Sequence, residues 1–207
     1  MMLTAAEPRK NGLVALFLDG EKAVDLDAET YLKSGLKPGD ELTDERLHDL
    51  LGASDARRAE RKAMELLGFR ARSQKELALR LSRSVPREAA EKAAERMTEL
   101  GLVNDEDYAR RLARELFGRR HFASGRVRME LVRRGIPRDL AERAAAEAEP
   151  DPGDALRELV GRKYARDLGD EKGRRRAVAA LRRMGYRWDD IRHVMNEFAA
   201  DTEDGEK

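Results

Sequence analysis

The chain repeats a pattern of apolar residues at a spacing of about 50 residues, and this repeat restricts its fold more than any other feature. The aligned apolar positions are Leu77, Val127 and Ala177; Leu81, Leu131 and Leu181; Val85, Ile136 and Tyr186; Ala90, Ala141 and Ile191; and Ala93, Ala144 and Val194. Their spacing places them on one stripe of each helix. We therefore predict a mainly α fold, in which three tandem three-helix repeats form an elongated array.

Helix start and stop signals divide each repeat into three helices. Ser73-Gln-Lys-Glu76 fits a capping box, and Pro86 and Pro137 suit first helical positions. Gly135 and Gly185 mark helix ends. The predicted helices are 55–69, 73–84 and 86–100, then 105–119, 124–134 and 137–148, and finally 152–167, 171–184 and 188–198.

The first 52 residues have a different pattern, which predicts a small β-hairpin and helix cap. An apolar run over 12–18 and an alternating segment over 21–26 flank Asp19-Gly20, a pair typical of a type I′ turn. Asp27 is expected to cap a short helix through Ser34, and Thr43 a second helix through Leu51.

The predicted domains also differ in charge. They are an acidic cap (1–52), three repeats (53–103, 104–149 and 150–198) and an acidic disordered tail (199–207). The cap carries 6 basic and 11 acidic residues, a net charge of −5, whereas residues 53–198 carry +9. This asymmetry indicates a polyanionic partner, or an acidic end that competes for the same basic face. A helix surface of mixed charge is the alternative.

The second predicted helix of each repeat is basic. Repeat one carries Lys75, Arg80 and Arg83 there. Repeats two and three carry Arg126, Arg128, Arg133, Arg134, Arg174, Arg175, Arg176, Arg182 and Arg183. The shared pattern predicts a periodic basic face that binds phosphate or an acidic protein groove. The alternative, for any single arginine, is that it lies on a solvent-exposed helix surface without a binding role.

Aromatic residues near these helices allow two interpretations. Trp188, Tyr186, Tyr108 and Phe122 could stack on bases beside arginine. Packing is favoured for Tyr108 and Tyr186, which match apolar positions, while Trp188 and Phe122 lie next to helix starts and are open to exposure.

No catalytic or metal site is predicted. The three histidines, His48, His121 and His193, lack a second ligand at helical spacing, and the chain contains no cysteine. Glu115, Glu130 and Asp189-Asp190 are explained by helix surface and N-caps rather than by acid and base catalysis. We expect no cofactor, no membrane span and a soluble cytoplasmic protein.

Four stretches of the chain resemble the RecX family of recombination regulators. They are Ser73-Gln-Lys-Glu-Leu77, Gly101-Leu-Val-Asn-Asp-Glu-Asp-Tyr-Ala109, the segment from Gly125 to Ile136, and Arg182-Arg-Met-Gly-Tyr186 followed by Asp190-Ile191. The resemblance covers residues 57–198, and the hairpin cap is similar to an N-terminal extension of some members. One departure is Arg83-Ser84-Val85, which is one residue short and lacks the usual glycine, so we expect a different helix turn there.

The resemblance implies a non-enzymatic protein that binds RecA recombinase filaments, and we expect it to be a monomer. Such a protein would modulate strand exchange, ATP hydrolysis and SOS induction, with inhibition as the expected direction. The nine arginines of repeats two and three are the residues predicted to face RecA or DNA. A direct DNA-binding module of the helix-turn-helix type, acting on single- or double-stranded DNA, remains the alternative.

Overall fold

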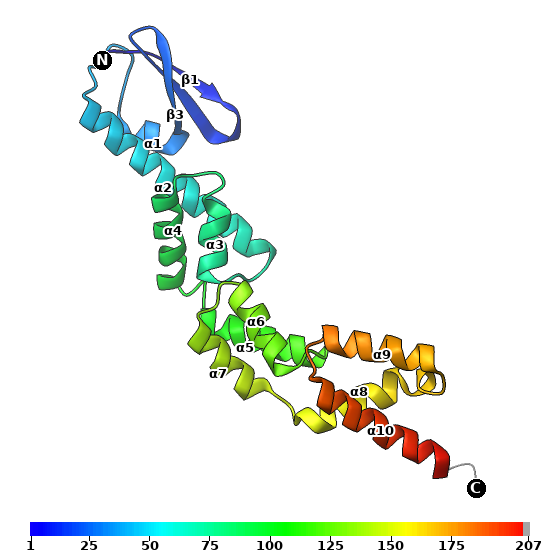
Figure 1. The fold of residues 1–207 in the computed structure, drawn as a ribbon. Coiled ribbons are helices and arrows are strands. Elements are labelled where there is room, and N and C mark those ends of the chain that lie inside the picture. Colours follow the sequence, from blue (N-terminus) through cyan, green and yellow to red (C-terminus); the bar gives the residue numbers. More distant parts are fainter. Residues whose placement is uncertain (205–207) are drawn as a thin grey trace. The chain divides into compact units, whose positions relative to one another are not determined.

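The computed structural model describes the backbone of residues 1–204 and the side chains of residues 1–166 and 168–198. It is mainly helical with a small N-terminal sheet (Figure 1). The chain forms two compact units, Met1–Asn104 and Asp105–Lys207. The predicted fold class, a mainly α chain of three-helix repeats behind a small cap, is confirmed.

The cap contains one strand more than predicted. The expected hairpin pairs β2 (Leu13–Leu18) with β3 (Glu21–Asp27), and its turn residues Asp19 and Gly20 have φ angles of 50° and 90°. The missed strand is β1 (Leu3–Arg9), which pairs antiparallel with β2 through the short 3-10 turn η1 (Lys10–Gly12). Leucines from all three strands form the cap core together with residues of the following helices.

A single long helix joins the cap to repeat one. After α1 (Ala28–Ser34), helix α2 runs continuously over Asp44–Phe69, so the prediction of separate helices ending at Leu51 and starting at 55 is wrong. Gly52 costs this helix only about 1 kcal/mol relative to alanine, which packing offsets. The predicted domain boundary at residue 52 therefore falls inside a helix that the cap and repeat one share.

Asp27 connects the sheet to this helix. It is 1% exposed, caps α1 through the backbone N–H of Glu29, and accepts a 2.6 Å hydrogen bond from Nη1 of Arg61. Its own N–H donates to Oγ of the buried Ser54 at 2.7 Å. Burial alone would raise the pKa of Asp27, but the hydrogen bonds from Arg61, Thr30 and Glu29 hold it below the usual range.

The three repeats have the predicted helices with small differences at their ends. Repeat one uses the later part of α2 with α3 (Gln74–Leu81) and α4 (Arg87–Glu99). Repeat two consists of α5 (Asp105–Gly118), α6 (Ser124–Arg133) and α7 (Arg138–Ala148). Repeat three consists of α8 (Pro152–Lys163), the short 3-10 helix η2 (Ala165–Asp167), α9 (Glu171–Arg183) and α10 (Trp188–Asp204). Pro86 and Pro137 are N-cap residues rather than the first helical residues that the sequence predicted, so α4 and α7 each begin one residue after the proline. Of the predicted acidic tail, residues 199–204 belong to α10 and 205–207 lie outside the described residues.

Each repeat has its own apolar core, built from the predicted stripe. The paired positions of the second helices, Leu77 and Leu81, Val127 and Leu131, and Ala177 and Leu181, are all 0% exposed. Alanines on α4 and α7 pack against them, and the absence of longer side chains lets these helices approach closely. Full burial of a leucine side chain contributes about 1.5–3 kcal/mol, so these pairs are major stabilising contacts.

The turn after the second helix differs between repeats, as the sequence predicted. In repeats two and three, the N–H groups of Ile136 and Tyr186 bond to carbonyls five residues earlier, both at 3.2 Å, around glycines with φ of 90° and 98°. In repeat one, the N–H of Val85 bonds to the carbonyl of Leu81, four residues earlier. The missing residue therefore shortens the turn, and no glycine is needed there.

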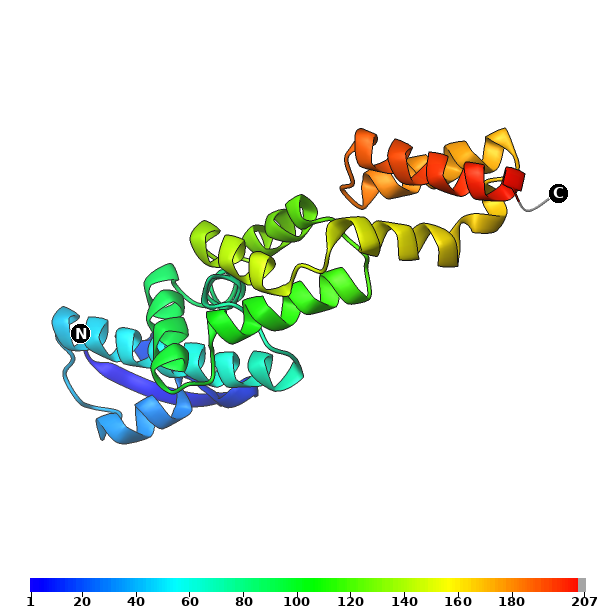
Figure 2. The ribbon, with the colours of Figure 1, turned by 90° about the horizontal axis from the view of Figure 1, so that it is seen from below.

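Repeats two and three are joined inside the second unit, which Figure 2 shows from another side. The N–H of Ala123, the N-cap of α6, donates to the carbonyl of Met184 at 2.9 Å. A Cβ added to Gly185 would lie 2.7 Å from the Cβ of Arg126. Gly185 therefore combines a left-handed φ with a close approach to α6.

We predict that Gly185→Ala destabilises the second unit by roughly 2 kcal/mol or more, because strain and a steric clash act together. Chemical denaturation of the full chain measures the change. Gly101→Ala is the control, since Gly101 has a φ of 71° but its added Cβ would meet nothing within 4 Å. Equal losses for the two variants would contradict a close contact at Gly185.

We predict that Asp27→Asn lowers the free energy of unfolding by about 1–3 kcal/mol near neutral pH, because it leaves Arg61 without its carboxylate. The pKa of Asp27 is depressed in the folded state, so its contribution is complete above the unfolded value of about 3.9 and is lost as pH falls through the folded value. Urea titrations across this range should show the difference from wild type shrinking with acid. Asp49→Asn, an exposed change on α2, should cost little at any pH.

Candidate functional site

The nine predicted arginines lie on or directly after α6 and α9, the second helices of repeats two and three. Because positions 127, 131, 177 and 181 of these helices face the repeat cores, the arginines occupy the remaining sides. The basic residues of repeat one, Lys75, Arg80 and Arg83, are all exposed on α3 or in the turn after it.

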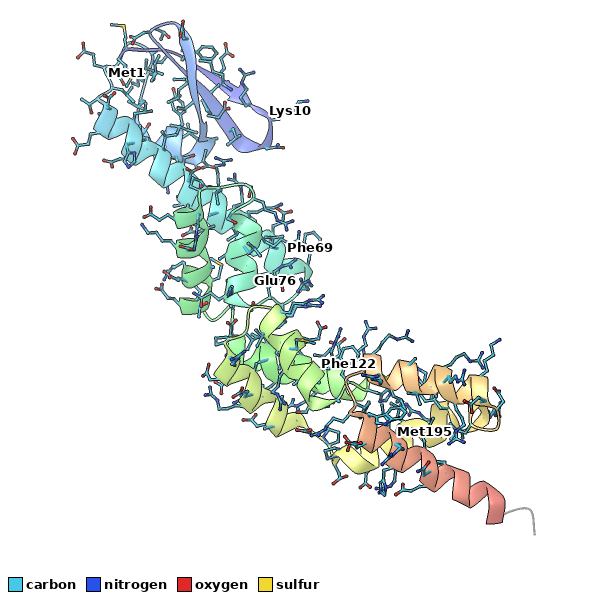
Figure 3. All side chains as sticks on the ribbon, in the orientation of Figure 1. Met1, Lys10, Phe69, Glu76, Phe122 and Met195 are labelled. Carbon is cyan, nitrogen blue, oxygen red and sulfur yellow. The ribbon has the colours of Figure 1, made fainter. Side chains whose placement is uncertain are left out.

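The second helix of repeat one also begins next to a buried ion pair. Glu76, which Figure 3 labels, lies in the first turn of α3. It pairs with Arg70 and, at 2.7 Å, with the buried Arg72. Burial would raise the pKa of Glu76, but the two arginines hold it below its usual value. These two arginines therefore have a structural partner within unit one.

Arg126 on α6 is partly committed to packing. Its Nη2 lies 2.9 Å from Glu130, and its guanidinium lies 5.4 Å from the ring centroid of Phe122. Its Nε is buried without a hydrogen-bond partner among the described residues. These contacts, together with the close approach of Gly185, indicate that Arg126 serves the joint between repeats two and three.

The other arginines of α6 have weaker contacts. Arg128 donates to Oγ of Ser124 at 3.2 Å, and Arg134 to the hydroxyl of Tyr108 at 3.4 Å. Arg133 is 73% exposed and lies 3.7 Å from Glu130. Exposed pairs of this kind contribute little, so an anionic partner can compete for these guanidinium groups.

Three arginines of α9, at positions 175, 182 and 183, have few contacts. Arg175 pairs with Glu171 at 3.0 Å, and both side chains are largely exposed. Arg182 and Arg183 are exposed and form no ion pair with any described side chain. They are the predicted residues that an anionic partner can reach at the lowest cost in broken contacts.

A groove of about 540 Å³ lies between α9 and α10, and we call it the α9–α10 groove. Its lining combines basic, aromatic and apolar side chains: Glu171, Arg174, Arg175, Val178, Ala179, Arg182, Trp188, Ile191, Arg192, Met195 and Asn196. Trp188 is 50% exposed, and Met195 lies on α10 facing this groove (Figure 3). Three of the nine predicted arginines, Arg174, Arg175 and Arg182, therefore line the same groove as Trp188.

Arg192 is a groove residue that the sequence analysis missed. It lies one helical turn after Trp188 on α10, so the i, i+4 spacing of the two residues was the available signal. Conversely, Arg176 and Arg183 do not line the groove, nor do the four arginines of repeat two. The predicted basic residues therefore do not form one continuous site.

A second missed feature is an exposed apolar residue at equivalent positions of two repeats. Leu79 on α3 is 65% exposed and Met129 on α6 is 55% exposed. Each lies midway between two fully buried positions of its helix, and therefore points away from the repeat core. Each also lies four residues before an exposed arginine, which is Arg83 in the turn after α3 or Arg133 at the end of α6. We call these pairs the outer apolar–arginine pairs.

A cavity of about 770 Å³ lies between repeats two and three in the second unit. Its walls include Phe122 and Tyr186, with charged groups of both signs such as Arg128 and Asp190. Burial raises the pKa of Tyr186. The predicted packing role of Tyr186 agrees with this position at the joint.

The described part of the chain holds no cluster of three His, Asp or Glu side chains suited to a metal ion. Over residues 1–204, no helix has the length and apolar character needed to cross a bilayer.

Comparison with known proteins identifies relatives along most of the chain. The family model of the second three-helix domain of RecX matches residues 104–144. The regulatory protein RecX of Caldanaerobacter subterraneus subsp. tengcongensis is 30% identical over 171 residues, which cover 79% of this chain and 84% of that protein. The regulatory protein RecX of Trichlorobacter lovleyi is 37% identical over 116 residues, covering 53% of this chain and 75% of its own.

Solved structures support the fold. A crystal structure of regulatory protein RecX has a TM-score of 0.62 at 18% identity and covers 94% of this chain and 98% of its own. RecX from Lactobacillus salivarius has a TM-score of 0.59 at 20% identity, over 72% of this chain and 99% of its own. The shared three-helix repeats and the identity to these relatives show that the chain belongs to the RecX family of regulatory proteins.

Proposed function

We propose that this protein is a non-enzymatic regulator that binds RecA recombinase filaments in the cytoplasm and inhibits strand exchange, ATP hydrolysis and SOS induction. Membership of a family of regulatory proteins supports a regulatory role. The observation that carries the proposal is the repetition of one basic helix, α3, α6 and α9, in three consecutive repeats. A surface that repeats along one chain matches a partner that is itself built from repeated subunits.

The outer apolar–arginine pairs favour a protein partner for α3 and for α6. Leu79 and Met129 expose apolar surface next to Arg83 and Arg133. A phosphate backbone offers no apolar surface that could bury an exposed leucine or methionine. A protein groove can bury such a side chain and place an acidic residue beside the neighbouring arginine. The pairs occur in two repeats, so two contacts of the same kind can act together and raise the affinity through multivalency.

The rival function, direct DNA binding by a helix-turn-helix module, makes a different prediction. Its affinity for bare duplex would fall steeply with salt, by about 0.9 unit of log K per phosphate neutralised. Under the proposed function, RecA filaments bind the protein more tightly than the bare DNA on which they form. Binding measured at several salt concentrations, with and without RecA, separates these cases.

We predict that the wild-type chain inhibits ATP hydrolysis by RecA on single-stranded DNA. For a charge-reversal variant, the protein concentration that gives half inhibition should be at least roughly tenfold higher than for wild type. The variant replaces four exposed arginines of the basic face with glutamate: Arg133, Arg134, Arg182 and Arg183. Helix content should be unchanged, because none of these side chains belongs to a repeat core. No effect of the wild-type chain at stoichiometric excess would refute the proposed function.

The matched control reverses four exposed basic residues of the third helices, which gives the same change of net charge. It replaces Arg87, Lys92, Arg138 and Arg143 with glutamate. If both variants lose inhibition equally, overall charge rather than the basic face governs binding.

We also predict that Leu79→Ser combined with Met129→Ser weakens inhibition by about tenfold or more, since burying one such side chain is worth 1.5–3 kcal/mol. Both residues are exposed in the free protein, so the free energy of unfolding should change little. Leu32→Ser combined with Met64→Ser, at exposed positions of α1 and α2, serves as the control and should inhibit like wild type. Equal inhibition by both double variants would exclude the outer apolar–arginine pairs from the interface.

A further inference from the structure

We propose that the α9–α10 groove is a binding site for single-stranded nucleic acid, in which a base stacks on Trp188 and the flanking phosphates bind the groove's arginines. This site is separate from the outer apolar–arginine pairs, which lie on α3, in the turn after it and on α6. It does not rest on the proposed function, because it requires no RecA.

The first argument is the excess of free positive charge. Four arginines line the groove against a single carboxylate, that of Glu171, which pairs with Arg175 at 3.0 Å. The other three, Arg174, Arg182 and Arg192, form no ion pair with any described side chain. Arg174 and Arg182 are eight residues apart on α9, which places them about 12 Å apart along the helix axis. Cations therefore follow the length of the groove, as a groove that tracks a phosphate backbone requires.

The second argument is the exposed indole. Trp188 is 50% exposed at the first position of α10, whereas the other large apolar side chains of the groove are closed off. Ile191 and Met195 are 0% and 4% exposed. A half-exposed indole beside arginine side chains is a typical platform for stacking an unpaired base.

The same numbers favour nucleic acid over an acidic peptide. An amphipathic helix binds through several apolar anchors spaced along its face and needs a groove with a long accessible apolar floor. Here Ile191 and Met195 are covered and Val178 is half-buried, so the largest accessible apolar side chain of the lining is the flat ring of Trp188. A planar base matches that ring, and its phosphates match the unpaired guanidinium groups. A duplex offers no unpaired base, so single strands are preferred.

The test uses the full chain and its own fluorescence. Trp188 is the single tryptophan of the sequence, so quenching of intrinsic fluorescence reports directly on this groove. The probe is an oligothymidylate of about 16 nucleotides, a length in the range that single-strand modules occupy. Comparison ligands are an abasic oligonucleotide of equal length, a duplex and polyglutamate.

We expect the oligothymidylate to quench Trp188 and to bind roughly tenfold more tightly than the abasic strand, because stacking of one base is worth 1–3 kcal/mol. Arg182→Gln and Arg192→Gln should each weaken binding several-fold and reduce the salt slope by about 0.7, the value for one phosphate of a single strand. Trp188→Phe should retain most of the affinity and Trp188→Ala should lose about tenfold, measured by anisotropy of a labelled oligonucleotide.

Arg187→Gln is the matched control. Arg187 directly precedes Trp188 and does not line the α9–α10 groove, so its loss should leave the affinity within about twofold. Circular dichroism checks that each variant keeps the helix content of wild type.

Three results would overturn the proposal. Equal affinity for the abasic strand would show that no base is stacked. Quenching by polyglutamate at the same concentration would assign the groove to acidic polypeptides. If Arg187→Gln weakened binding as much as Arg192→Gln, binding would depend on diffuse surface charge rather than on the α9–α10 groove.

Discussion

Burial of two positions on the second helix of each repeat is the constraint on which the rest of this structure depends. The pairs at 77 and 81, at 127 and 131, and at 177 and 181 are closed to solvent in all three repeats. They fix the rotation of α3, α6 and α9 about their axes. Once that rotation is fixed, the outer positions 79 and 129 and most of the arginines face solvent. The same contacts that stabilise each repeat therefore also determine which residues are exposed.

The three basic helices are equivalent in position but not in how their charges are balanced. On α6, Glu130 pairs with Arg126 and lies 3.7 Å from Arg133, while Phe122 covers Arg126. On α9, the corresponding position 180 is an alanine, and Arg182 and Arg183 form no ion pair with described side chains. Releasing a guanidinium from a carboxylate costs free energy that binding must recover, so repeat three offers an anionic ligand more than repeat two.

The sequence predicted those features that follow from local rules. Helical periodicity placed the core residues of the repeats, and the Asp19-Gly20 pair identified the hairpin turn. The missing residue before Val85 correctly indicated a shorter turn. The errors arose where distant contacts override local preference. Gly52 and Ser54 resemble a helix break, but the hydrogen bond of Ser54 to Asp27 and the packing of α2 keep the helix continuous. Strand β1 was missed because Thr4-Ala-Ala-Glu7 has little apolar alternation, and pairing with β2 decides its conformation.

The sequence could predict which helices are rich in arginine, but not which group each guanidinium contacts. Arg126 and Arg182 look alike in the sequence, yet one is held at a joint between repeats and the other lines an open groove. The difference arises from a neighbouring repeat in the first case and from the next helix in the second. Arg192 was missed for the same reason, because its significance depends on α9 lying alongside α10. Three helical repeats that share the positions of their core residues thus differ in the side chains that they expose, as Met129 on α6 and the equivalent Ala179 on α9 illustrate.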